Sequence, residues 1–219
     1  MSELLNEYDN FIHAEMMTHP ALFTHAGAKK IAIFDGKNDS LLLEVLKHPS
    51  VTDVWQLNAL GDEEVYSSDP RFHFQPDKPI EWLAQLEPAS LDIIISDNNP
   101  TAVLSNTFYE NSLRALADNG ILIRQCISQF NPLRLKATYQ AVKKAGFSDL
   151  QILHFTLPGS PAGCGAAILA LKNGSFKRLR EKEIYNKSFA TRYYNFDVHK
   201  ASLALPEFIR EDLHNITSS

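Results

Sequence analysis

The segment from Leu91 to Asp97, LDIIISD, constrains the fold of this chain more than any other part of the sequence. A continuous apolar run of this length is typical of a strand in a parallel sheet, because helices cover both faces of such a sheet. A strand with one face in water alternates apolar and polar residues instead. We therefore expect a strand at the centre of an α/β sheet.

Predicted strands and helices alternate along most of the chain. Strands are expected at residues 29–34, 53–58, 71–75, 91–97, 120–126, 150–156 and 165–172, and helices at residues 3–19, 40–48, 79–86, 106–120 and 132–146. Pro20 is expected to end the first helix, and Gly120 and Gly146 to end the last two. No helix separates the last two strands, which predicts one antiparallel strand near an edge. The pattern predicts an α/β fold with a doubly wound, mostly parallel seven-stranded sheet.

Length and composition are those of one globular domain. The 219 residues are 44% hydrophobic, and we expect an N-terminal helix (1–25) followed by one domain (26–219). The net charge is −5 without a block of Lys or Arg, so neither nucleic acid nor an anionic membrane is an expected partner. The first residues are polar and acidic, unlike a signal peptide, and no apolar run reaches the roughly 20 residues that span a membrane. Cys126 and Cys164 are expected to be buried thiols. These features predict a cytoplasmic protein.

Ligands of doubly wound sheets bind beyond the carboxyl ends of the strands, where the strand order reverses. Three predicted strand ends carry polar residues. Asp35 to Asn38 follow the first strand with a single glycine, so on these residues alone a surface loop is the simpler interpretation. Asn58 ends the second, where an acidic residue would bind ribose hydroxyls. Asp97 ends the third and could either bind a ligand or start an Asx turn.

The histidines do not form a metal-binding pattern. His13, His19 and His25 are spaced by six residues, which places them on different faces of a helix. The sequence also contains no G-x-S-x-G element of the hydrolase type. Neither a zinc enzyme nor a serine hydrolase is indicated.

Four stretches, in the same order, resemble the spermidine synthase (polyamine aminopropyltransferase) family. They are DNFIHAEMMTH (9–19), LEVLKHPSV (43–51), DIIISD (92–97), and a C-terminal region with RYYN (192–195), VHKA (198–201) and LPEF (205–208). The chain is identified as a divergent member that lacks the family's N-terminal β-domain. The resemblance implies a Rossmann-like sheet of the methyltransferase type.

The resemblance also implies a reaction. The family transfers an aminopropyl group from decarboxylated S-adenosylmethionine to putrescine, so polyamine and nucleoside ligands are the expected partners. An amine attacks a methylene next to a sulfonium, which requires positioning, proton removal and carboxylates around cationic substrates. The sulfonium supplies the leaving group, so we expect no metal and no cofactor besides this co-substrate. Assembly as a homodimer or with a full-length homologue stays open.

The family's site residues can be placed on this sequence. Its catalytic aspartate falls on Asp97, and His13 stands where the family has a tyrosine. An imidazole has a pKa near neutrality, so we expect His13 to share the proton transfer, the alternative being a solvent-facing helix residue. The residues expected to contact substrate are Glu15, Asp35, Asn38, Asn58, Asp77, Lys78, Asn98, Asn99 and Ser160.

Several of these positions differ from the family. Asn38 and Asn58 stand where the family has acids, and Ser160 where it has a tyrosine. Each lost carboxylate weakens substrate binding by about 1.5–3 kcal/mol. The alternative function is therefore a catalytically inactive relative that serves as a binding or regulatory subunit. A methyltransferase is a third hypothesis, although its cofactor would meet the same altered residues.

Overall fold

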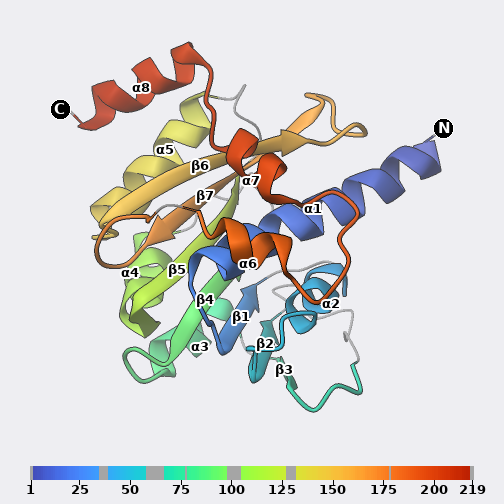
Figure 1. Cartoon of the computed structure of the whole chain (residues 1–219). Helices are drawn as coiled ribbons and strands as arrows, with labels where there is room; N and C mark the ends of the chain where they lie inside the picture. The colour runs from blue at the N-terminus through green and yellow to red at the C-terminus, as the bar shows by residue number, and fades with distance from the viewer. Residues whose placement is uncertain are drawn as a thin grey trace.

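The computed structural model describes residues 2–34, 39–57, 67–76, 78–97, 105–126, 132–177 and 179–217, and Figure 1 shows how their helices and strands are arranged. The strands are β1 (Lys30–Phe34), β2 (Asp53–Leu57), β3 (Phe72–Gln75), β4 (Leu91–Ser96), β5 (Leu116–Cys126), β6 (Asp149–Thr156) and β7 (Cys164–Leu171). The helices are α1 (Ser2–Thr24), α2 (Ser40–Leu46), α3 (Pro79–Gln85), α4 (Asn106–Ala115), α5 (Pro132–Lys144), α6 (Glu181–Tyr185), α7 (Phe196–Ser202) and α8 (Glu207–Thr217).

The seven strands form one sheet in the order β3-β2-β1-β4-β5-β7-β6. All neighbours are parallel except those of β7, which runs antiparallel to both β5 and β6. Ile33 of β1 pairs with Gln56 on one side and with Ile95 on the other, so the strand order reverses beside β1. The doubly wound, mostly parallel sheet and its antiparallel strand next to an edge are confirmed.

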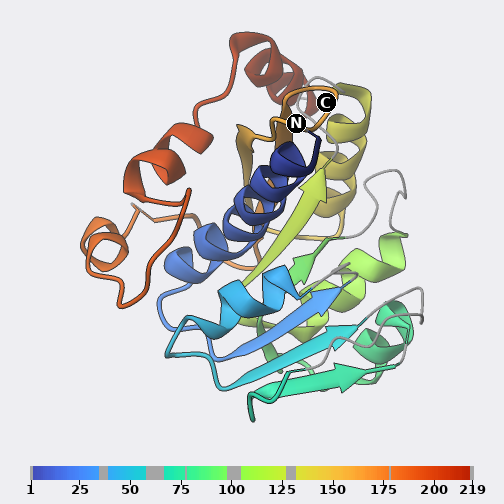
Figure 2. The same ribbon diagram turned by 90° about the vertical axis from the view of Figure 1, so that its right-hand side faces the viewer.

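Helices cover both faces of the sheet, as the apolar strands require (Figures 1 and 2). Ile93 and Ile95 of β4 belong to a core shared with α1, α2 and the C-terminal segment, whereas Ile94 faces a second core. The second core is closed by α3, α4, α5 and α8, through side chains such as Trp82 and Phe108. Both cores meet at β4, whose apolar residues alternate between them.

Helix α1 is longer than the sequence predicts, so the expectation that Pro20 ends it is wrong. Proline lacks the backbone N–H and costs about 3 kcal/mol inside a helix. The residues after it nevertheless continue the helix and bury Ala21, Leu22 and Phe23 in the core. Complete burial of a Leu or Phe side chain contributes about 1.5–3 kcal/mol, which offsets the proline. Tertiary packing therefore overrides a local stop signal.

Gly120 does not end helix α4, contrary to the prediction. The helix ends at Ala115, and β5 begins at the next residue. Leu91 pairs with Leu116 and Ile93 with Ile121, so β5 bulges out between these two pairs. A Cβ atom on Gly120 would lie 2.8 Å from the carbonyl oxygen of Ala117, which shows that the glycine serves a close backbone approach.

The remaining turn and thiol predictions are confirmed. Gly146 follows α5 with a φ of 108°, the left-handed conformation that a helix-terminating glycine adopts. Cys126 and Cys164 are free and buried, and burial raises the pKa of Cys126 to about 12. Thiols of this kind are apolar core residues.

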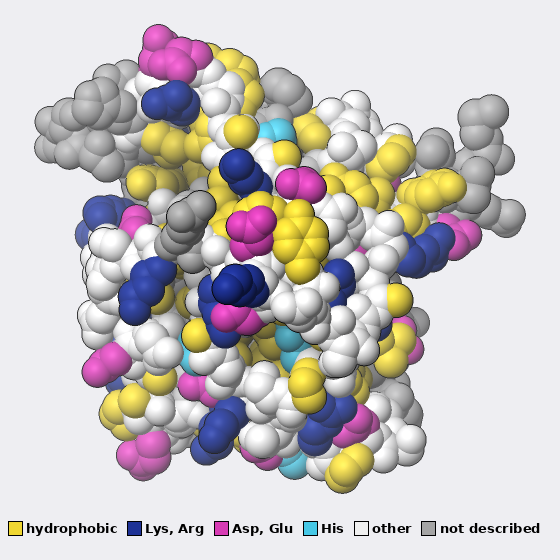
Figure 3. Space-filling model, viewed as in Figure 1, with side chains coloured by type: hydrophobic (Ala, Val, Ile, Leu, Met, Phe, Trp, Pro, Cys, Tyr) yellow, Lys and Arg dark blue, Asp and Glu magenta, His cyan; other side chains and the backbone are white. Residues whose placement is uncertain are grey.

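Two observations concern the outside of the protein. None of the helices in the described part of the chain has the length and apolar character needed to cross a membrane. Figure 3 shows acidic and basic side chains interspersed over one face of the molecule. This face therefore carries no extended field of one sign.

We predict that Gly120→Ala lowers the free energy of unfolding by about 1–3 kcal/mol, because the new methyl group would lie 2.8 Å from the carbonyl oxygen of Ala117 and 2.8 Å from Cβ of Leu116, two atoms that move only with the backbone. Urea denaturation measures the difference. An unfolding midpoint equal to that of the wild type would contradict the close approach within β5.

Candidate active site

Asp97 lies where the fold rule places a ligand site. It is the first residue after β4, and its backbone N–H donates to the carbonyl oxygen of Phe34, the last residue of β1, over 2.9 Å. The strand order reverses between these two strands. Asp97 therefore stands at the carboxyl edge of the sheet, at the position where such folds bind ligands.

His13 of α1 reaches the same point. Its Nε2 atom lies 2.6 Å from Oδ1 of Asp97, although the two residues are 84 positions apart in the chain. The side chains are 19% and 12% exposed, so the pair is largely shielded from water but still accessible. A nitrogen–oxygen distance this short is typical of a charge-assisted hydrogen bond. The structure thus brings the two predicted catalytic residues together.

The surroundings of His13 favour its protonated form. Burial by itself lowers its pKa, but the Asp97 carboxylate, through its charge and its hydrogen bond, and the charge of Asp9 outweigh burial and raise the pKa above 6.5. A carboxylate only accepts hydrogen bonds, so Nε2 carries a proton, and the neutral ring keeps its lone pair on Nδ1. Asp97 therefore orients an imidazole whose other nitrogen can accept a proton.

Glu15 fixes the helix that carries His13. Its buried carboxylate accepts three backbone hydrogen bonds, from Arg192 (2.7 Å), Tyr193 (2.9 Å) and Tyr194 (2.7 Å). Both carboxylate oxygens are thus engaged within the protein. The geometry gives Glu15 a structural role, in which it attaches the C-terminal segment to α1, and we do not propose it as a substrate ligand.

The side chain of Arg192 extends this attachment along α1. Its guanidinium lies 3.8 Å from the centre of the Phe11 ring and donates to Oε1 of Glu7 over 3.0 and 3.1 Å. These contacts are at the surface, where an ion pair contributes about 0–1 kcal/mol. The stabilisation therefore comes chiefly from Glu15.

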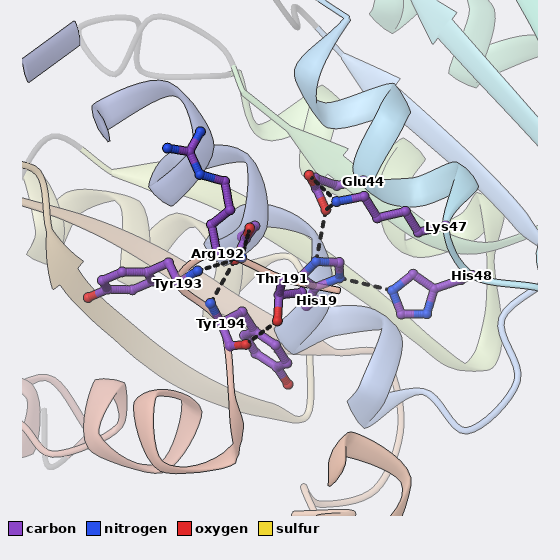
Figure 4. Close-up of polar contacts among 9 residues, drawn as sticks. His19, Glu44, Lys47, His48, Thr191, Arg192, Tyr193 and Tyr194 are labelled. Carbon is purple, nitrogen blue, oxygen red and sulfur yellow. Dashed lines mark hydrogen bonds and ion pairs between the residues drawn. The ribbon is translucent and has the colours of Figure 1, made fainter. Parts of the chain in front are cut away.

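A buried polar cluster holds α1 against α2. His19 contacts His48 through Nδ1 (3.0 Å) and Glu44 through Nε2 (3.1 Å), and Lys47 donates to Glu44 over 2.7 Å (Figure 4). Burial lowers the pKa of His19, and burial together with the nearby charge of Lys47 lowers the pKa of His48 to about 3. Both imidazoles are therefore neutral structural groups. Within the described residues, no group of three or more His, Cys, Asp or Glu could hold a metal ion.

Two further predicted substrate contacts can be located. Ser160 lies in the turn between β6 and β7, and since β6 is parallel to β4, this turn is at the same sheet edge as Asp97. Lys78 is an exposed residue at the start of α3, 4.0 Å from Glu81. The other predicted contacts, Asp35, Asn38, Asn58, Asp77, Asn98 and Asn99, lie outside the described residues.

Comparison with known proteins identifies the family. The profile described as "Spermine/spermidine synthase domain" matches residues 10–179. The chain belongs to the spermine/spermidine synthase family. It is 33% identical to the polyamine aminopropyltransferase of Thioalkalivibrio sulfidiphilus, over 96% of this chain and 81% of that protein. Identity to the corresponding protein of Xylella fastidiosa (strain M12) is 36%, over 96% and 80%.

Solved structures share the fold. A spermidine synthase in complex with the transition state analogue AdoDATO superposes with a TM-score of 0.84 at 24% identity, covering 93% of this chain and 75% of that one. The spermidine synthase of Thermotoga maritima gives a TM-score of 0.82 at 24% identity, covering 93% and 74%. The fold and family inferred from the four sequence stretches are thus confirmed.

The family membership establishes the type of reaction. Polyamine aminopropyltransferases are enzymes, and the relatives match this chain over nearly its whole length. The chain is accordingly a transferase of the aminopropyl type, and none of these relatives supports the inactive alternative.

We predict that Glu15→Gln lowers the free energy of unfolding by about 1.5–3 kcal/mol, because a carboxamide loses the charge and turns an NH2 group toward at least one of three N–H donors. Glu7→Gln, the same change at an exposed position on the same helix, is the matched control and should alter stability by less than about 0.5 kcal/mol. Equal effects in urea denaturation would contradict the anchoring role.

Acid sensitivity should come partly from His48. The unfolded chain protonates this residue below about pH 6.5, whereas the folded protein does so only near pH 3. The unfolded state thus binds more protons in this range, and stability falls as the pH drops from about 6.5 toward 3. His48→Gln should make the decline of unfolding free energy with acid shallower, as denaturant titrations at several pH values would measure. An unchanged slope would contradict this prediction.

Proposed function

We propose that this protein transfers the aminopropyl group of decarboxylated S-adenosylmethionine to putrescine, with Asp97 and His13 as the residues that handle the proton. The observation that carries the proposal is the 2.6 Å contact between His13 and Asp97 at the carboxyl edge of the sheet. Aminopropyl transfer itself follows from the family. The identities of donor and acceptor, and the roles of the two residues, are the proposed part.

The reaction forms one bond and breaks another. The lone pair of a putrescine nitrogen attacks the methylene next to the sulfonium, a C–N bond forms, and the C–S electron pair returns to sulfur as methylthioadenosine leaves. Putrescine is protonated near neutral pH, so the enzyme must first hold an ammonium group and remove its proton. A carboxylate next to a proton acceptor meets both requirements.

The two residues divide this work. Asp97 attracts the ammonium group and, through Nε2, holds the imidazole of His13 in one tautomer and orientation. Nδ1 of His13 then accepts the proton. The raised pKa of His13 suits this step, since a stronger base takes a proton from an amine more readily.

Several sequence positions support a nucleoside donor at the same edge. Asp35 directly follows β1 and Asn38 comes three positions later, Asn58 directly follows β2, and Asn98 and Asn99 come directly after Asp97. Strand ends of this kind surround the ligand in doubly wound folds. A spermidine synthase of the same fold binds the transition state analogue AdoDATO. We propose these residues, with Asp77, Lys78 and Ser160, as substrate contacts and the cytoplasm as the compartment.

We predict that Asp97→Asn lowers kcat/KM for spermidine formation by about 10²–10⁴-fold and His13→Gln by about 10²-fold, since each removes part of the acid–base machinery. Formation of spermidine and methylthioadenosine is measured by mass spectrometry. The matched controls are Asp53→Asn and His73→Gln, a second aspartate–histidine pair (3.1 Å) located toward the opposite, amino edge of the sheet. These controls should keep wild-type activity.

Two outcomes would contradict the proposal. Absence of turnover at high enzyme concentration, together with no calorimetric binding of methylthioadenosine, would favour the inactive relative. A methylated product formed from S-adenosylmethionine would favour a methyltransferase on the same fold.

A further inference from the structure

Asp9 of α1 forms a hydrogen bond with a distant part of the chain. Its Oδ1 atom accepts a hydrogen bond from the backbone N–H of Gly159 over 3.0 Å, across 150 positions of the chain. The side chain is half-buried. A hydrogen bond from backbone to carboxylate is charge-assisted and fixes the donor segment in place.

The donor belongs to the turn between β6 and β7. This turn is closed by three backbone hydrogen bonds, from Leu157 to Gly163 (3.0 Å), from Ser160 to Leu157 (3.1 Å) and from Gly163 to Ser160 (2.8 Å). It holds the proposed substrate contact Ser160. Since the turn is internally bonded, attachment at Gly159 positions it as a unit.

Asp9 also lies on the side of α1 that carries His13. The two residues are four positions apart, so their side chains are neighbours on one helix face. The ring of His13 lies 6.2 Å from the ring of Phe155, near the end of β6, and its Nε2 contacts Asp97 at the end of β4. The helix face with Asp9 and His13 therefore meets the ends of two strands.

We propose that Asp9 is a positioning residue, which fastens the β6–β7 turn to α1 and places a second negative charge beside the His13–Asp97 pair. The inference rests on the proposed function, because it assigns the turn and His13 to the site of amine binding. Asp9 itself is not assigned a contact with substrate.

Among the described residues, two carboxylates and one aromatic ring face His13. Asp97 faces it from the end of β4 and Asp9 from α1 itself, while β6 contributes the apolar ring of Phe155. Burial lowers the pKa of His13, Asp97 raises it most, and Asp9 raises it further. Removal of the Asp9 charge should therefore shift the protonation of His13 to lower pH.

Two substitutions separate the two roles. Asp9→Asn keeps a side-chain oxygen that can accept the hydrogen bond from Gly159 but removes the charge. The rising limb of the plot of kcat/KM against pH should therefore move to lower pH, while the KM for putrescine should stay nearly unchanged. Asp9→Ala removes both, so the same shift should be accompanied by a rise in KM of about tenfold, the loss expected when a charged hydrogen-bond partner is removed. Glu7→Gln, on the same helix, is the control and should change neither.

A measurement that needs no turnover distinguishes failure of this inference from failure of the proposed function. The imidazole signal of His13, assigned with His13→Gln, is followed by NMR during a pH titration of wild type, Asp9→Asn and Glu7→Gln. We expect it to titrate at lower pH only in Asp9→Asn. The proposal is overturned if His13 titrates at the same pH in Asp9→Asn as in the wild type. It is also overturned if Asp9→Ala and Asp9→Asn have the same KM for putrescine. Either result counts against it even if aminopropyl transfer is demonstrated.

Discussion

The carboxylate of Glu15 accepts three consecutive backbone N–H groups of the C-terminal segment, and the geometry of the candidate active site depends on this attachment. A buried carboxylate is costly without partners, and hydrogen bonds to it contribute about 1.5–3 kcal/mol each. These hydrogen bonds attach the C-terminal segment to α1, and the apolar residues of α1 pack against the strands of the sheet. His13, two residues before Glu15, is thereby held at the strand ends.

The site differs from the rest of the core in its use of charge. The buried imidazoles of His19 and His48 are kept neutral by burial, whereas His13 has two carboxylates close enough to reverse the effect of burial on its pKa. The same residue type thus serves as a structural group in one place and as a candidate proton acceptor in another. The difference is set by two carboxylates: Asp97 meets His13 through the packing of α1 across the sheet edge, and Asp9 lies about one helical turn from His13 on α1 itself.

The strongest sequence signals predicted the fold correctly where local pattern and tertiary packing agree. The apolar run 91–97 is β4, the two adjacent strands at residues 149–171 include the antiparallel β7, and Gly146 ends α5. Two predicted helix ends were wrong, because tertiary contacts override the local stop signals of Pro20 and Gly120. Pro20 lies inside α1 because burial of the next residues offsets its cost, and Gly120 lies in β5 because a backbone approach requires it there.

The sequence by itself determined the alternation of strands and helices, the family, and the position of Asp97 at a strand end, since these depend on periodicity and on residues adjacent in the chain. It suggested His13 only through the resemblance and did not single out Asp9. The contacts of His13 with Asp97 and of Asp9 with Gly159 join residues 84 and 150 positions apart. Only the tertiary structure decided these two contacts. The hydrophobic pattern of a helix specifies which of its faces is buried, but the packing of the helix on the sheet determines which polar groups meet.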